Sequence, residues 1–211
     1  MTDTSECGVP FSLAIFAVIL SYIWIFEPTA RGAVRIAPVV IVVVLAIVKA
    51  SRTGEWGFRG DAFLASLVKA MAVTAIAVAM TLAAGEVLGT LHPRRAVGRS
   101  LAFLTLWGGG QQFVLQTVVL REAREFMPRG AAIIVSAALF STVHLPNPFL
   151  AGVTFVAALV WCSIYSRHPN IIPLAMSHAL GTEAILHAFD NDVTGHLRIG
   201  AAFLELRQLG G

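Results

Sequence analysis

The chain has 211 residues, of which 57% are hydrophobic and 13% are charged, and its formal net charge is +3. A soluble domain is roughly 45–50% apolar and about 25% charged, so this composition excludes a single water-soluble core. The basic residues stand singly between apolar blocks, which argues against nucleic acid as a partner. We therefore predict an all-α, polytopic membrane protein in contact with membrane lipid. At about 20 residues per span, the length allows about seven to eight transmembrane helices.

The N-terminal half contains three apolar blocks. Residues 9–26 and 36–48 predict the first two helices, and residues 62–84 predict the third. Between the second and third blocks, residues 55–61 mix aromatic and charged side chains, as expected at the level of the lipid headgroups.

The C-terminal half continues the pattern with shorter polar connections. The chain after residue 190 would be a tail or a final short helix ending near residue 203. We treat residues 1–211 as one membrane domain. Four further helices are predicted at residues 101–120, 131–143, 149–165 and 171–189.

Glutamines interrupt the block at residues 101–120. Gln112 and Gln116 are four residues apart and therefore share a helix face, with Gln111 beside them. The preceding run of three glycines, 108–110, permits either a close helix approach or a local break in the helix. Glutamines in membrane helices commonly join helices by hydrogen bonds, so the group alone does not establish a site.

Histidines and a glutamate occupy two later helices. His144 ends a short apolar stretch and precedes two prolines, whereas His178, Thr182 and Glu183 lie within the last long block. Each has an ordinary structural interpretation as a capping residue, an interface residue or a partner in an ion pair. Polar groups on three membrane helices must nevertheless be satisfied inside the protein, which favours one shared polar pocket.

The order of these groups resembles the CPBP family of glutamic-type intramembrane proteases, which includes the type II CAAX prenyl endopeptidases and bacteriocin-processing proteases. The family motifs EExxxR, FxxxH and HxxxN or HxxxD would fall, respectively, on residues 111–116, on Phe140 with His144, and on His178 with Thr182.

The resemblance covers residues 101–189, the expected core, and implies that a buried glutamate activates water for attack on a peptide bond. In this chain the motif glutamates are Gln111 and Gln112, the motif arginine is Gln116, and the motif Asn or Asp is Thr182. A glutamine can orient water but cannot take a proton near neutral pH. Loss of a general base costs about 10²–10⁴ in rate.

Two functions follow from the resemblance. The first is an active CAAX-type intramembrane endopeptidase (a hydrolase) that cleaves a membrane-embedded or prenylated peptide, with Glu183 or Glu122 supplying the missing carboxylate. The second is a catalytically impaired relative that binds a hydrophobic peptide as a scaffold, immunity or sorting factor. A small transporter is less favoured, because no matching pair of interrupted spans is present. The residues expected to form the catalytic site are Gln111, Gln112, His144, His178, Thr182 and Glu183.

The sequence indicates no organic cofactor. His144, His178 and Glu183 have the side-chain types of zinc ligands, but no closely spaced motif such as HExxH supports a zinc site. A compact polytopic chain without a signal-peptide pattern indicates a bacterial or archaeal cytoplasmic membrane.

Overall fold

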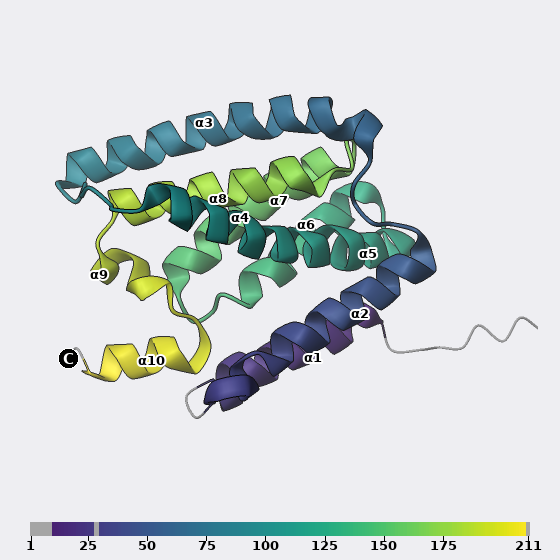
Figure 1. Ribbon diagram of the computed structural model, residues 1–211, viewed down its shortest axis with the longest axis horizontal. Helices are drawn as coiled ribbons and strands as arrows, with labels where there is room; N and C mark the ends of the chain where they lie inside the picture. The colour runs from purple at the N-terminus through teal and green to yellow at the C-terminus, as the bar shows by residue number, and fades with distance from the viewer. Residues whose placement is uncertain (1–9, 28–29, 210–211) are drawn as a thin grey trace, which may run out of the picture.

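The computed structural model describes residues 10–27 and 30–209, and the regular elements in this part of the chain are all helices, without a β-strand. The prediction of an all-α fold is therefore confirmed (Figure 1). Val9, the first residue of the first predicted helix, lies outside the described residues.

Three long helices form the N-terminal half. A π-helical turn, η1 (Tyr22–Phe26), continues the first of them, and Gly54 ends the second in the left-handed conformation, with φ of 69°. The long helices are α1 (Phe11–Ser21), α2 (Ala37–Thr53) and α3 (Phe63–Leu88).

The C-terminal half holds the remaining helices. One continuous rod passes from α4 (Val97–Val114) through the π-helical turn η4 (Leu115–Leu120) into α5 (Arg121–Phe126). The glycine run therefore does not break the helix. The others are α6 (Arg129–Thr142), α7 (Pro148–Tyr165), α8 (Ile171–Ala188), α9 (Asn191–Thr194) and α10 (Gly200–Leu209).

Helix α8 is the centre of the bundle, with α3 along one side and α4 along another, while α6 pairs with α7 and α1 with α2 (Figure 1). The contact between α3 and α8 depends on small residues. Ser66, Ala70 and Thr74 are buried at intervals of four residues, and a Cβ on Gly85 would lie 2.5 Å from the carbonyl oxygen of Ala188. Small side chains let the two helix backbones approach closely. In a membrane, where burial from water does not drive association, this close packing holds helices together.

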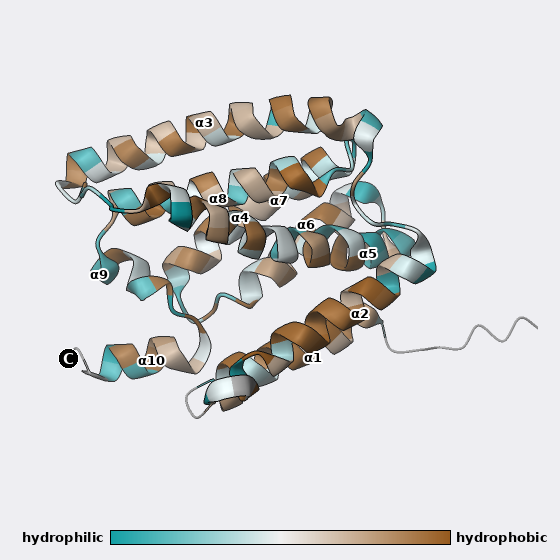
Figure 2. Cartoon of the chain, in the orientation of Figure 1, coloured by the Kyte–Doolittle hydropathy of each residue, from teal (hydrophilic) through white to brown (hydrophobic). Residues whose placement is uncertain are grey.

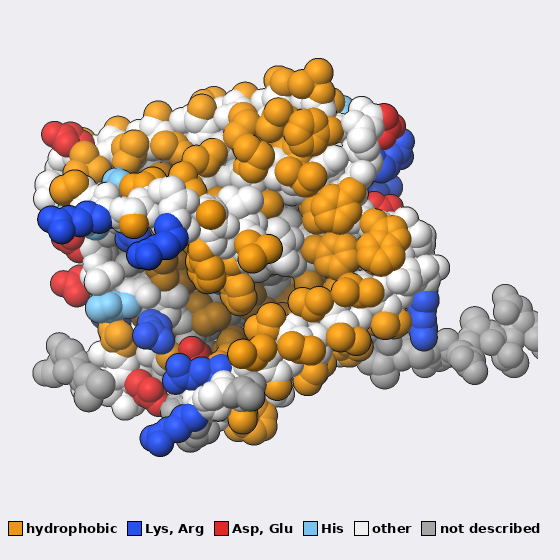
Figure 3. Space-filling model, viewed as in Figure 1, with side chains coloured by type: hydrophobic (Ala, Val, Ile, Leu, Met, Phe, Trp, Pro, Cys, Tyr) orange, Lys and Arg blue, Asp and Glu red, His pale blue; other side chains and the backbone are white. Residues whose placement is uncertain are grey.

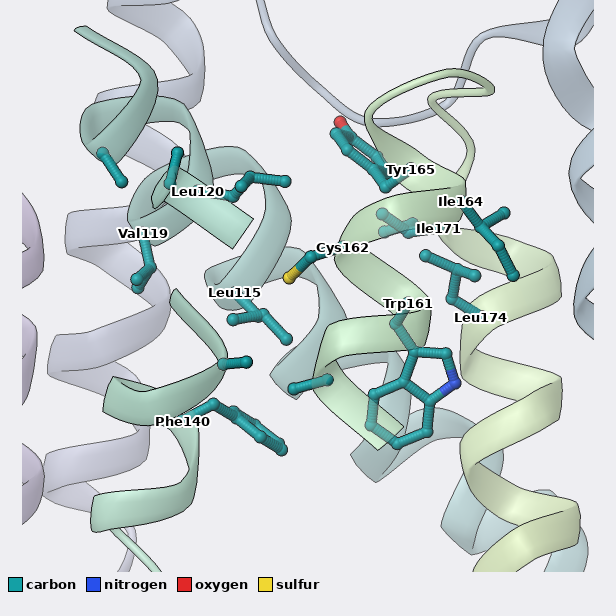
Figure 4. Packing of buried hydrophobic residues seen from close by; sticks show 14 of the residues in the cluster. Leu115, Val119, Leu120, Phe140, Trp161, Cys162, Ile164, Tyr165, Ile171 and Leu174 are labelled. Carbon is teal, nitrogen blue, oxygen red and sulfur yellow. The ribbon is translucent and has the colours of Figure 1, made fainter. Parts of the chain in front are cut away.

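The main core lies between η4, α6, α7 and α8. Figure 4 shows Trp161 and Cys162 of α7 directed into the space between Leu115 and Leu174. Leu115 and Leu174 are 1% and 0% exposed. The helices that carry the polar motifs are therefore packed directly against one another.

Apolar side chains also cover the outside of the bundle. Among the described residues, two helices are long and apolar enough to cross a membrane, Gly60–Leu88 and Pro148–Tyr165. Helix α3 exposes Leu64, Ile76 and Met80 by more than 60% each, an arrangement that suits lipid rather than water. Figure 2 shows hydrophobic residues along the helices, and Figure 3 shows hydrophobic side chains across the face in view with charged side chains gathered toward its two ends.

Candidate functional site

Gln112 and Gln116 form a buried pair on the rod made by α4 and η4. Their exposed fractions are 0% and 1%, and Nε2 of Gln116 donates a 3.0 Å hydrogen bond to Oε1 of Gln112. Gln111 Oε1, Gln112 Nε2 and Gln116 Oε1 have no hydrogen-bond partner in the described structure. Three unpaired amide atoms in a membrane helix leave unused hydrogen-bonding capacity for a bound molecule or water.

His178 of α8 lies against the same rod. A Cβ on Gly108 would lie 3.0 Å from Cγ of His178, so the glycine is what lets the imidazole approach α4. Gln112 follows Gly108 by four residues and shares its helix face, which puts the glutamine one turn from the imidazole. Nδ1 of His178 is buried without a hydrogen-bond partner in the described residues.

His144 follows α6 and is held by its own helix end. Its Nδ1 lies 2.9 Å from the carbonyl oxygen of Phe140. A carbonyl only accepts, so Nδ1 carries the proton and Nε2 is left as the acceptor of a neutral imidazole.

Aromatic rings connect the two histidines across three helices. The ring centroids of His144 and Phe140 are 5.1 Å apart, those of Phe140 and Trp161 6.4 Å, and those of Trp161 and His178 4.9 Å. The structure therefore brings together the second and third motifs, with α7 supplying the ring between them.

Thr182 and Glu183 lie farther along α8. Thr182 is one turn beyond His178 on the same face and partly buried. The carboxylate of Glu183 accepts hydrogen bonds from Ser100 Oγ at 2.5 Å and Arg94 Nε at 3.2 Å. Ser100 precedes Gln112 by twelve residues, or about 18 Å along the helix. Glu183 therefore lies apart from the glutamines and has its own partners.

Glu122 lies at the opposite end of the rod. Its carboxylate accepts hydrogen bonds from the backbone N–H groups of Phe11 and Ser12 and lies 3.0 Å from Lys49 Nζ. It is therefore the anion at the N-terminus of α1, where unpaired N–H groups attract negative charge. Neither glutamate lies beside the glutamine pair in this arrangement.

The ligand set proposed for zinc is not assembled. No group of three His, Cys, Asp or Glu side chains among the described residues is placed to hold a metal ion. Glu183 is bound to Ser100 and Arg94 instead of facing the two histidines. Structural and catalytic zinc sites take at least three protein ligands, so His144 and His178 alone do not fit zinc.

Several buried residues near the motifs carried no recognisable signal in the sequence. Trp161 stacks on His178, and Ser136 Oγ is buried without a hydrogen-bond partner in the described part of the chain. Cys162 is fully buried with its thiol beside the Gln116 amide. Their positions depend on how α6 and α7 pack, which local spacing does not reveal.

Among the described residues, no carboxylate lies beside the glutamine pair and the two histidines. The amides and imidazoles of the site are neutral hydrogen-bonding groups, capable of gripping a water molecule or a peptide unit in a lipid environment. Proton abstraction would fall to a histidine.

The family model described as "Type II CAAX prenyl endopeptidase Rce1-like" matches residues 33–182, well over half of the chain. The match includes all three motifs. No curated protein and no solved structure matches the chain.

Proposed function

The chain belongs to the Rce1-like family of type II CAAX prenyl endopeptidases, and from this premise we propose that it binds a hydrophobic or prenylated peptide in the membrane with strongly impaired hydrolysis. Proteins of this family are integral membrane proteins that act on prenylated CAAX peptides. The proposed pocket is lined by Gln111, Gln112, His144, His178 and Thr182.

The observation that carries this proposal is that both candidate glutamates, Glu183 and Glu122, are held by other residues away from the glutamines. Glu183 is bound to Arg94 and Ser100, and Glu122 is bound to Lys49 and the start of α1. Moving either carboxylate to the glutamines would leave a partly buried cation or several helix N–H groups unpaired, which is costly. Without a carboxylate, water activation loses about 10²–10⁴ in rate.

The unpaired amide atoms support peptide binding. An extended peptide in lipid presents N–H and C=O groups that must find partners in the protein. Gln111 Oε1 is an unused acceptor and Gln112 Nε2 an unused donor, both buried. A peptide unit has one N–H donor and one C=O acceptor. Its N–H could donate to Gln111 Oε1, and its C=O could accept from Gln112 Nε2.

A second candidate function, slow peptide hydrolysis, is favoured by one observation. His178 Nδ1 is buried without a partner, and Nε2 of His144 is the acceptor of its imidazole. A neutral imidazole can serve as a general base. In this alternative a histidine takes the proton from water while the amides hold the peptide carbonyl.

The membrane architecture remains part of the proposal. We infer seven to eight membrane helices in one domain, residues 1–211, with residues 101–189 as the functional core. Helices shorter than a full span, such as α6, would be accommodated by local thinning of the bilayer and by flanking polar side chains that reach the interface. A bacterial or archaeal cytoplasmic membrane is the proposed location, since a compact polytopic chain suits it.

The decisive experiment measures binding and cleavage of a farnesylated, fluorescently labelled peptide in proteoliposomes. We expect the wild-type protein to bind the peptide without cleavage above background, His178→Ala to weaken binding, and Gln111→Glu combined with Gln112→Glu to produce cleavage. Gln208→Glu, an exposed change of the same kind on α10, is the matched control and should behave as wild type.

Two results would contradict the proposal. If the wild-type protein cleaves the peptide and His178→Ala abolishes that cleavage, the slow-hydrolysis candidate is established instead. Absence of both binding and cleavage, in a protein shown by circular dichroism to be folded, would remove both candidates.

A further inference from the structure

A cavity lies at the end of the bundle away from Glu183. It has a volume of about 270 Å³ and is enclosed by the segment before α3, by η4 and α5, and by the turn between α7 and α8. Gln116 lies in its wall, so the cavity adjoins the buried glutamine pair without containing either histidine. Four arginines line it: Arg59, Arg121, Arg124 and Arg167.

The positive charge in this cavity is only partly compensated. Arg59 pairs with Asp61 at 2.6 Å, and Arg121 lies 3.7 Å from Glu125. Arg124 and Arg167 form no ion pair within the described residues. An excess of guanidinium groups around one hollow favours an anionic ligand.

The acidic residue of the cavity is already engaged. Glu55 accepts a 2.6 Å hydrogen bond from the hydroxyl of Tyr165, and both residues line the hollow. This hydrogen bond fixes one wall. Because Arg59 and Arg121 are paired with Asp61 and Glu125, the remaining charges of the lining are Arg124 and Arg167 against the single carboxylate of Glu55.

The position of the cavity along the helices places it at the membrane surface. The two helices long and apolar enough to cross a membrane are Gly60–Leu88 and Pro148–Tyr165. The cavity is lined by Arg59, next to the beginning of the first, and by Tyr165 and Ser166, at the end of the second. The ends of membrane helices lie at the depth of the lipid headgroups.

Exposed aromatic side chains flank the basic lining. Phe58, next to Arg59, is 53% exposed, and Phe126, two residues after Arg124, is 75% exposed. Apolar groups beside an arginine cluster suit a ligand that is both charged and hydrophobic. A soluble anion would need only the arginines.

We propose that this cavity is a binding site for the phosphate group of an anionic phospholipid, with Arg124 and Arg167 as its principal contacts. Guanidinium groups bind phosphate oxygens through paired, charge-assisted hydrogen bonds. Basic pockets between membrane helices bind lipid headgroups in this way. The inference does not depend on whether the histidine site cleaves peptides.

The test uses the full chain in detergent, with phosphatidylglycerol added and bound lipid measured by native mass spectrometry. Wild-type protein should retain phosphatidylglycerol in preference to phosphatidylcholine. Arg124→Gln combined with Arg167→Gln should weaken retention about thirtyfold, since each basic residue near an anionic headgroup contributes about fivefold. Arg129→Gln, an exposed arginine at the start of α6 outside the cavity, should leave retention unchanged.

Three results would overturn the assignment. Equal retention of phosphatidylcholine would show that the arginines do not select an anionic headgroup. Undiminished phosphatidylglycerol binding by the double variant would place the lipid elsewhere. If inorganic phosphate alone displaces phosphatidylglycerol at equal concentration, the site is for a soluble phosphate and the lipid assignment is wrong. Thermal unfolding of each variant confirms that a loss of binding does not reflect a loss of fold.

Discussion

The indole of Trp161 lies nearly parallel to the imidazole of His178, with their ring centroids 4.9 Å apart and their planes inclined by 12°. Nε1 of the indole donates a 2.9 Å hydrogen bond to Ser177 Oγ, which is hydrogen bonded in turn to Thr74 Oγ1 at 2.6 Å. The orientation of the histidine is therefore set by residues of α7 and α3 as well as by α8.

Replacing Trp161 separates stacking from hydrogen bonding. Trp161→Phe keeps an aromatic ring but removes the indole N–H that donates to Ser177 Oγ, and should lower the free energy of unfolding by about 1–3 kcal/mol. Trp161→Ala also opens a cavity and should cost about 3–5 kcal/mol. Denaturant unfolding in detergent measures both, with Trp107→Phe, at an exposed tryptophan, as the control. Equal costs for Phe and Ala at position 161 would argue against a role for the ring.

Adding one methyl group to α4 should disturb His178. In Gly108→Ala the new Cβ would lie 3.0 Å from the imidazole Cγ, and overpacking of this kind costs about 1–3 kcal/mol. Gly110→Ala meets nothing within 4 Å and should stabilise the helix by up to about 1 kcal/mol. Thermal unfolding together with peptide binding compares the two. If Gly108→Ala and Gly110→Ala change the melting temperature in the same direction, the close contact between Gly108 and His178 is contradicted.

Glu183 should behave as a structural residue. Glu183→Gln weakens the contacts with Arg94 and Ser100 and should lower the free energy of unfolding by about 1.5–3 kcal/mol. Binding of the labelled peptide by the folded variant should be unchanged, because the carboxylate is about three turns from the glutamines. Glu86→Gln, at an exposed position of α3, is the control. If Glu183→Gln has wild-type stability but no longer binds the peptide, Glu183 is part of the binding site and the structural role is wrong.

Acid should loosen the attachment of α1 through Glu122. Burial opposes ionisation of this carboxyl, but hydrogen bonds from Ser12 and Lys49 outweigh burial and hold its pKa below the ordinary value of 4.5. Its stabilisation is therefore complete above pH 4.5 and is lost as the pH falls through the lower folded-state pKa. The melting temperature measured from pH 7 to pH 3 should fall less in Glu122→Gln than in wild type. Glu125→Gln, one turn nearer the surface, should retain the wild-type slope.

The helices follow from the sequence because apolar blocks are long and separated by polar connections. The ends are less predictable. Helix α2 continues to Thr53, beyond the predicted end at residue 48, because charged residues such as Lys49 and Arg52 are good helix formers. The continuation of the glutamine-bearing rod through Arg121–Phe126 is, by contrast, expected from the interspersed opposite charges of residues 121–125, and α5 confirms it.

Spacing in the sequence predicts contacts within one helix. The contacts of a side chain with residues distant in the sequence depend on how the helices pack. The interval of four between Gln112 and Gln116 indicates a shared face, and their hydrogen bond confirms it. Nothing near Glu183 in the sequence indicates that Arg94 and Ser100, more than eighty residues earlier, would bind its carboxylate. The zinc hypothesis fails for the same reason, since it depends on where that side chain points.

Gln111, Gln112 and Gln116 carry no net charge, which limits how strongly a transmembrane potential acts on these side chains. A transmembrane potential of 100 mV does about 2.3 kcal/mol of work on each elementary charge that crosses it. Amides carry no net charge, so repacking of these three side chains couples to the membrane potential only through their dipoles. Peptide capture by the glutamines should therefore proceed alike in energised and de-energised membranes.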